Sequence, residues 1–430
     1  MNVKQIKIPE NKKSAKWWSY IIRTLFILLI GVGVGFLALC MVYMLPVERM
    51  YENAQVSKDI ISDIGTTYAI HEIRSTELDT YTDSIMVSTA ICPKEASVFE
   101  KVVYNYHVGY YRGYLEQENL ERYLSGEPGY DYASYSHYWN GYLLFLKPLL
   151  YFFEYNDILM FNFILQTMLI VWVVIGMVKK KKEYLIIPFM ISILSMAAPL
   201  ATAINLQNSD ILYLALLGSG IIIWGNDKII ENKGYFIFLV LGMMTSYFDF
   251  LTYPLVSLGI PLVVYIACVN TNKVFETVVK TIVNSIGWGI GYVGMWIGKG
   301  LLGSILYPDS RALETGIEHF FMRSSNSVSS GQVSFVDVTI NNLYIYLSWP
   351  MIVIFLIVVI YAFIKIIKRR NWKRDTIVRM VPYIVVLIYP FAWYFILKNH
   401  SYIHPFVYRN LAIATFAGLT ALFSLAEQYE

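Results

Sequence analysis

Long apolar runs, about ten in number, are the feature that most constrains the fold of this chain. Most approach or exceed the roughly 17–25 residues that a helix needs to cross the hydrocarbon core of a bilayer. Their spacing along the whole chain predicts a polytopic membrane protein. The predicted transmembrane helices are residues 24–45, 157–178, 184–204, 209–224, 235–250, 254–269, 277–302, 343–364, 379–397 and 408–425.

Composition supports the same class. Hydrophobic residues make up 57% of the chain and charged residues 15%, and the mean hydropathy is +0.50, which excludes an ordinary soluble globule. The net charge of +3 is spread over short loops, so no nucleic-acid partner is predicted. Cys40, Cys92 and Cys268 have neither disulfide nor metal-ligand spacing. We therefore predict an all-α membrane protein with one integral membrane domain over residues 1–430; no cofactor is indicated, although a divalent cation stays possible.

The basic residues predict the orientation in the membrane. Lys and Arg gather in the N-terminal segment and in alternate loops, at residues 4–23, 179–182, 228–233, 273–280 and 365–374. Because such residues favour the cytoplasmic side, we expect both termini in the cytoplasm of a multi-pass protein of the cell membrane. Two large loops, residues 46–156 and 303–342, then face outside.

The large first loop carries its own predicted structure. Residues 97–124 have helical spacing and end at the breaker 125–129, which favours one amphipathic helix on the membrane surface. Residues 142–153 are apolar but too few to span, so an interfacial or re-entrant segment is predicted. Glu77, Asp79 and Asp83 lie where this loop returns toward the bilayer. Functional residues concentrate in such loops.

The glycines of the run 277–302 have two interpretations. Gly287, Gly291, Gly294 and Gly298 resemble the glycines of a phosphate-binding loop only in number, since no strand precedes them. Small residues at helical spacing in an apolar helix let neighbouring helices approach closely. We expect them to serve helix packing.

Several ionisable residues lie in or beside the outer ends of the predicted spans. Charges are costly there and mark functional sites by default, although a charge near a helix end can also extend its side chain to water. Tyr138 and Trp139 belong to a tyrosine-rich stretch that fits either an aromatic belt or a platform for a sugar. The candidates for substrate binding are Asp249, Lys299, His400, His404, Arg409, Tyr138 and Trp139.

The layout and four short motifs resemble the GT-C superfamily of membrane glycosyltransferases. These enzymes place an acidic motif and surface helices on a large external loop after the first span. The motifs are TDSIM (82–86), YWNGY (138–142), FDFLTYP (248–254) and HPFVYR (404–409). The family often has two adjacent acids, whereas the acids here are spaced apart.

The resemblance implies a reaction and roles for residues. A sugar would pass from a polyprenyl-phosphate donor to an external acceptor, such as a cell-surface glycan or teichoic acid, with inversion at the anomeric carbon. Asp83 is the first candidate for the general base and Asp79 the second, because a carboxylate can accept the acceptor's proton. Arg409, with His404 and Lys299, would bind the lipid phosphate. Asp249 is expected to pair with Lys299 or with a sugar hydroxyl.

Two other classes stay open. A secondary transporter or lipid flippase fits ten spans equally well, but its binding residues are expected near the midplane on broken helices or in repeated halves, and the sequence shows neither. A non-catalytic membrane scaffold or a degenerate enzyme is the third interpretation, and membrane lipids are expected partners in every case.

Overall fold

The computed structural model describes residues 10–61, 67–70, 72–109, 113–269, 273–368 and 378–426. About 78% of the chain is helical, as expected for an all-α membrane protein. Six helices of the described part are long and apolar enough to cross a membrane: Trp18–Tyr43, Tyr155–Lys179, Leu206–Trp224, Val274–Leu306, Trp349–Lys368 and Pro405–Ala426.

The other four predicted spans form shorter, interrupted or partly charged helices. Residues 184–204 divide into η2, α9 and α10, and residues 379–397 include two short helices, α19 and α20, each with a proline in its first turn. α13 is apolar but has only 15 residues, and α12 begins with charged residues. Ten continuous spans are therefore not found among the described residues.

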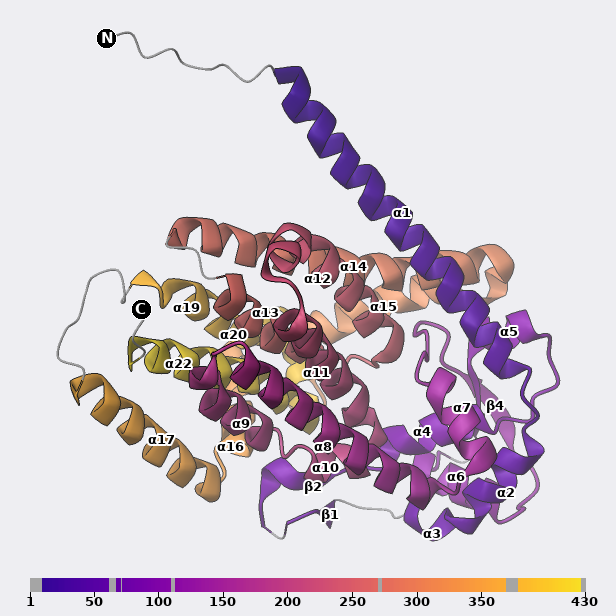
Figure 1. Cartoon of the computed structure of the whole chain (residues 1–430). Coiled ribbons are helices and arrows are strands. Elements are labelled where there is room, and N and C mark those ends of the chain that lie inside the picture. Colours follow the sequence, from indigo (N-terminus) through magenta and orange to yellow (C-terminus); the bar gives the residue numbers. More distant parts are fainter. Residues whose placement is uncertain are drawn as a thin grey trace.

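A bundle of helices forms the larger part of the molecule (Figure 1). α11 is its centre, in contact with α8, α12 and α13. The bundle contains α1 (Glu10–Tyr43), α8 (Tyr155–Lys179), η2 (Glu183–Leu185), α9 (Ile186–Ser195), α10 (Leu200–Ile204), η3 (Leu206–Asn208), α11 (Ser209–Trp224), α12 (Asp227–Phe248), α13 (Leu255–Val269), α14 (Val274–Leu306), α17 (Trp349–Lys368), α19 (Val381–Leu387), α20 (Tyr389–Ile396) and α22 (Leu411–Ala426).

α12 and α14 form the most extensive helix pair. A Cβ atom on Gly242 would lie 2.0 Å from the backbone oxygen of Trp288, and one on Gly291 would lie 2.0 Å from that of Leu239. Only glycine fits at these two crossings, because the backbones themselves are in contact. The structure confirms the predicted packing role of the glycines in α14.

Burial separates the inner helices from the outer ones. In the span that contains α11, 78% of the apolar window is buried, whereas the corresponding share is 17% in both α1 and α17. Figure 1 shows α1 standing out from the bundle along its N-terminal half. Exposed apolar surface of this extent is expected to face lipid in a membrane protein.

The first-loop layer, residues 46–154, lies at one end of the molecule beside the C-terminal end of α1 (Figure 1). β1 pairs antiparallel with β2, and β3 with β4 in the register His107 to Ala133. The layer contains α2 (Glu48–Val56), α3 (Lys58–Ile61), β1 (Thr67–Tyr68), η1 (Arg74–Thr76), β2 (Glu77–Leu78), α4 (Tyr81–Ala90), α5 (Val98–Tyr104), β3 (Tyr106–Gly109), α6 (Glu116–Leu124), β4 (Asp131–Ser134) and α7 (Leu143–Phe152).

The single surface helix predicted over residues 97–124 was wrong. Ser97 caps α5 by accepting a hydrogen bond from the amide of Glu100 at 3.1 Å. Asn105 then ends the helix in the left-handed conformation, with φ of 49°. The chain continues into β3 before α6 begins. Helical spacing alone could not reveal this left-handed residue.

The segment between α14 and α17 folds against the chain that leads into α22. It contains η4 (Pro308–Ser310), α15 (Ala312–Ser324), β5 (Ser327–Val328), β6 (Gly331–Gln332) and α16 (Phe335–Tyr346), and it contacts α21 (Lys398–Ile403) and η5 (Pro405–Asn410). Asn342 donates to the carbonyl of Ser401 at 2.7 Å. The second predicted loop is thus joined to the segment that carries His404 and Arg409.

Candidate functional site

Asp83, the first candidate for the base, is a buried acceptor of three hydrogen bonds. It lies in the first turn of α4 and is 0% exposed. Its carboxylate accepts from the Tyr155 hydroxyl at 3.0 Å, the Leu206 amide at 2.7 Å and the Gln207 amide at 2.9 Å. Burial raises its pKa to about 6, although these hydrogen bonds oppose the shift. Asp83 therefore fixes the backbone of residues 206 and 207.

Asp79, the second candidate, lies four residues earlier in a different environment. Its side chain is partly exposed, and Oδ1 accepts from the Tyr81 amide at 2.8 Å. Within the described residues, Oδ2 has no hydrogen-bond donor. Burial raises the pKa of this carboxyl, and the bond from Tyr81 opposes the rise. Asp79 thus retains a free oxygen for a ligand.

The backbone at Asp79 is held by the segment that Asp83 fixes. Asn205 Nδ2 and Gln207 Nε2 donate to the Asp79 carbonyl at 2.6 and 3.0 Å. The two acids therefore have connected roles: Asp83 sets the position of residues 205–208, and those residues set the position of Asp79.

Arg409 is almost fully buried, at 2% exposure, in η5. Nε donates to the Met196 carbonyl at 3.1 Å and Nη1 to Asn208 Oδ1 at 3.4 Å. Nη2 is buried and has no hydrogen-bond partner among the described residues. A buried cation with an unsatisfied donor is costly, so this group is suited to bind an anion.

Asp79 and Arg409 line the same small recess, which we call the acid–arginine recess. Its charged and amide side chains are Arg74, Glu77, Asp79, Asn205, Gln207, Asn208 and Arg409. Burial and the charge of Asp79 raise the pKa of Glu77, while Arg409 and Arg74 oppose the rise. The recess volume is about 10 Å³, room for roughly one water.

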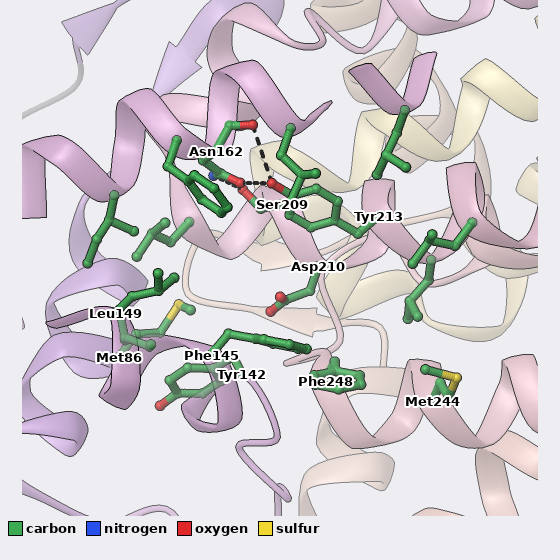
Figure 2. Close-up of a pocket in the computed structure, with 18 residues that line it drawn as sticks. Met86, Tyr142, Phe145, Leu149, Asn162, Ser209, Asp210, Tyr213, Met244 and Phe248 are labelled. Atoms are coloured by element: carbon green, nitrogen blue, oxygen red, sulfur yellow. Dashed lines mark hydrogen bonds between the residues drawn. The ribbon is translucent and has the colours of Figure 1, made fainter. Parts of the chain in front are cut away.

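A much larger apolar cavity of about 340 Å³ lies between α7, α8, α11 and α12. Figure 2 shows its mostly hydrocarbon walls, with the Asp210 carboxylate between the Asn162–Ser209 pair and Phe145. Asn162 Nδ2 donates to Ser209 Oγ at 2.6 Å. The cavity suits a hydrocarbon ligand, and Asp210 is its one acid among the residues described.

Residues 205–210 form a wall shared by the two spaces. Asn205, Gln207 and Asn208 line the acid–arginine recess, whereas Leu206, Ser209 and Asp210 line the apolar cavity. The sequence predicted a loop at residues 205–208 between two spans and placed residues 209 and 210 at the start of the second span. The amide-rich composition of residues 205–210, NLQNSD, was a signal that backbone and carboxylate groups would need partners nearby.

Lys299 and Trp139, both predicted to bind substrate, make structural contacts. Lys299 is 0% exposed, and its Nζ donates to the carbonyls of Val102 at 2.5 Å and Val103 at 3.1 Å, near the C-terminus of α5. Trp139 is 1% exposed and its Nε1 donates to the Met295 carbonyl at 2.8 Å. Both side chains join the first-loop layer to α14.

Asp249 closes the turn that follows α12. It accepts hydrogen bonds from the Thr252 amide at 3.0 and 3.1 Å and from the Thr252 hydroxyl. The predicted ion pair with Lys299 was wrong, because the ammonium group of Lys299 is bonded to α5 instead. Hydrogen bonds within the turn satisfy this carboxylate. The sequence prediction considered only a distant partner for it.

His400 and His404 belong to a second group of polar side chains, the histidine–arginine cluster, which we define as His137, His319, Arg323, His400 and His404, and Tyr138 lies beside it. The rings of His137 and His319 stack 4.3 Å apart, and those of His400 and His404 lie 4.7 Å apart. Arg323 is hydrogen-bonded to His404. Tyr138 lies 4.4 Å from His137.

Sequence reasoning missed three members of this cluster. His319 and Arg323 are four residues apart on α15, so they share one face of that helix. His137 directly precedes the tyrosine that was selected. Within the described residues, no group of three His, Cys, Asp or Glu side chains is placed to hold a metal ion.

Comparisons of the chain with protein-family models, curated proteins and solved structures gave no match. Functional conclusions therefore depend on the geometry of the recess, the cavity and the cluster.

Proposed function

We propose that the protein is a membrane glycosyltransferase of the GT-C type, which transfers a sugar from a polyprenyl-phosphate donor to an acceptor outside the cell. One observation carries this proposal: within the part of the chain that the structure describes, the acid–arginine recess combines a carboxylate with a free oxygen, Asp79, and a buried guanidinium with a free donor, Arg409. A base and an anion-binding group are the two functions that this reaction requires.

The proposed base is Asp79 rather than Asp83. The acceptor oxygen attacks the anomeric carbon, and its proton passes to Asp79. The bond from that carbon to the phosphate oxygen breaks, and the lipid phosphate leaves with the electron pair toward Arg409. Asp83 accepts three hydrogen bonds without access to a substrate, so its role is to position residues 205–208.

The apolar cavity supports a lipid-linked donor. Its hydrocarbon walls lie on the other side of residues 205–210 from the recess. A donor with an apolar chain and a phosphate head matches this pairing of spaces. At about 10 Å³ the recess does not admit a sugar, so substrate binding requires it to open.

The proposed topology keeps both termini in the cytoplasm and the recess outside, because the basic loops lie on the N-terminal side. Cys92 is buried and is a poor reporter. We expect a cysteine at exposed Ala133 to react with an impermeant maleimide in intact cells, and a cysteine at Lys181 to react only after lysis. The reverse pattern would invert the topology.

The function is tested with purified protein in nanodiscs and a panel of polyprenyl-phosphate sugars. We expect release of polyprenyl phosphate together with a glycosylated acceptor for at least one donor, and a roughly hundred- to ten-thousandfold lower turnover by Asp79→Asn. Equal turnover by the wild type and this variant would contradict the proposed role of Asp79 as the base.

Transport is the second candidate, and one observation favours it. The chain is interrupted between α9 and α10, and the Met196 carbonyl at this interruption accepts from Arg409 Nε at 3.1 Å. Broken helices with a carbonyl at a binding site are typical of transporters. Movement of a labelled lipid-linked sugar across proteoliposomes, without any acceptor, would favour this function over transfer.

A further inference from the structure

The histidine–arginine cluster is a surface-open group of basic side chains built from three parts of the chain. α15 supplies His319 and Arg323, α21 and the residue after it supply His400 and His404, and the first-loop layer supplies His137. His319, Arg323 and His404 are partly exposed, whereas His137 and His400 are buried. Two members of the cluster are therefore buried, and solvent can reach the other three.

The cluster has more donors than acceptors. Arg323 Nε is buried without a hydrogen-bond partner among the described residues. Among the described residues, neither ring nitrogen of His400, a residue 2% exposed, has a hydrogen-bond partner of normal geometry, although the backbone of Leu251 and Thr252 lies close enough to oppose the lowering of its pKa. A protonated histidine and an arginine can only donate, so an added acceptor would satisfy these groups.

Burial is the main cause that keeps the histidines of the cluster neutral. Burial, His319 and Arg323 together lower the pKa of His137 to about 3. Burial and Arg323 also lower the pKa of His404 to about 3, and burial lowers that of His400. The other charged or titratable groups whose fields reach the cluster are Glu318 on α15, Lys299 on α14, Asp249 after α12, and Tyr135 and Tyr138 of the first-loop layer.

We propose that the histidine–arginine cluster is a binding site for an oxyanion of the phosphate class and that the site takes up protons when the anion binds. The tetrahedral oxygens supply the acceptors that Arg323 and the histidines lack. The inference concerns a site separate from the acid–arginine recess and does not depend on sugar transfer.

Proton uptake follows from the sign of the interaction. A bound anion favours protonated imidazole, so the histidines gain protons on binding and the affinity rises as the pH falls. Each proton taken up contributes up to roughly tenfold in affinity per pH unit. The acid–arginine recess contains no histidine among its described lining residues and is not expected to behave in this way.

The test is calorimetric titration of the full-length protein in phosphatidylcholine nanodiscs with inorganic phosphate at pH 6 and pH 8. Two buffers of different ionisation enthalpy measure the protons exchanged. Because phosphate itself titrates between pH 6 and pH 8, the uptake assigned to the histidines is the part that is lost in His319→Gln. We expect a binding component that is at least tenfold tighter at pH 6 and that takes up protons. Its absence in the wild type would overturn the proposal.

Variants on one helix assign the site. Arg323→Gln is expected to abolish the pH-dependent component and to leave any phosphate binding in the recess unchanged. Arg311→Gln is the matched control, because Arg311 precedes the same helix, is exposed and pairs with Glu314. Partly exposed His319→Gln is the second probe and should reduce the proton uptake. Thermal unfolding shows whether each variant is folded. If Arg323→Gln and His319→Gln both bind phosphate as the wild type does, the proposal is overturned.

The source of the phosphate group is distinguished by lipid composition. In nanodiscs that contain phosphatidylglycerol, a site for a lipid headgroup would be occupied, and added phosphate would bind at least tenfold more weakly than in phosphatidylcholine. A site for a soluble phosphate group would keep the same affinity in both. Either result supports an oxyanion site and names its source.

Discussion

The acid–arginine recess and the apolar cavity share residues 205–210 and differ in almost every other property. The recess is small, about 10 Å³, and its lining carries two acids and two arginines. The cavity is about 340 Å³ and has Asp210 as its one charged side chain among the residues described. The difference shows how a six-residue segment can separate a charged space from an apolar one by directing different side chains to each.

Asp79→Asn tests the charged side and should have the largest effect. Loss of a positioned base costs roughly a hundred- to ten-thousandfold in turnover, with donor binding retained. Wild-type activity should also fall as the pH falls through the pKa of Asp79, which burial raises. The assay is steady-state release of polyprenyl phosphate, with Glu77→Gln as the control that removes a neighbouring acid. Full activity in Asp79→Asn would move the base elsewhere.

Arg409→Lys keeps the positive charge but removes the planar set of donors. Hydrogen bonds to charged groups contribute about 1.5–3 kcal/mol each, so we expect the KM for the donor to rise by roughly tenfold or more. Lys398→Ala, a partly exposed cation at the start of α21, is the control. An unchanged KM in Arg409→Lys would show that Arg409 does not bind the donor phosphate.

Leu217→Trp tests the apolar side by narrowing the cavity that Leu217 lines. Overpacking costs about 1–3 kcal/mol, so the KM for a long-chain donor should rise while that for a short-chain analogue changes little. Leu25→Trp on the exposed face of α1 is the matched control. An equal change in the KM for the long-chain donor and for the short-chain analogue would mean that the hydrocarbon chain binds outside the cavity.

Asp83→Asn tests the shared wall and should mainly affect stability. The amide oxygen cannot accept from all three donors, so we expect a loss of about 1–3 kcal/mol in the free energy of unfolding. Because burial raises the folded-state pKa of Asp83 from 3.8 to about 6, its contribution favours the folded state at low pH and is lost as the pH rises through 6.

The melting temperature of the wild type should accordingly rise as the pH is lowered from 7 toward 5, and this rise should be smaller in Asp83→Asn. Asp59→Asn, an acid on α3 with no part in the wall, provides the comparison. If the melting temperature of Asp83→Asn depended on pH as that of the wild type does, Asp83 would be excluded as the source of this pH dependence.

The sequence was sufficient for the class of fold and for part of the candidate site. Apolar run length predicted the helical membrane class, and the glycines of α14 were correctly assigned to packing. The count of spans was not confirmed, because hydropathy does not register the interruptions at residues 196–199 and at Ile388. Asp79 and Arg409 were both selected, and they line one recess.

Other residues could not be assigned from sequence because their partners are distant backbone groups. Lys299 is bonded to carbonyls 196 and 197 residues away, and Asp83 is bonded to amides 123 and 124 residues away. A list of charged residues near span ends does not distinguish such structural bonds from free groups. Arg323 was missed because its neighbours come together only through the fold.

The shared wall at residues 205–210 makes the two spaces thermodynamically dependent on each other. A ligand that displaces Leu206 or Asp210 also shifts Asn205 and Gln207, and with them the carbonyl of Asp79. Such coupling is reciprocal. If a ligand in one space changes the affinity of the other space by some factor, a ligand in that other space changes the affinity of the first by the same factor. In the proposed function, lipid in the cavity and an anion in the recess would therefore act as mutual effectors through a single strip of backbone.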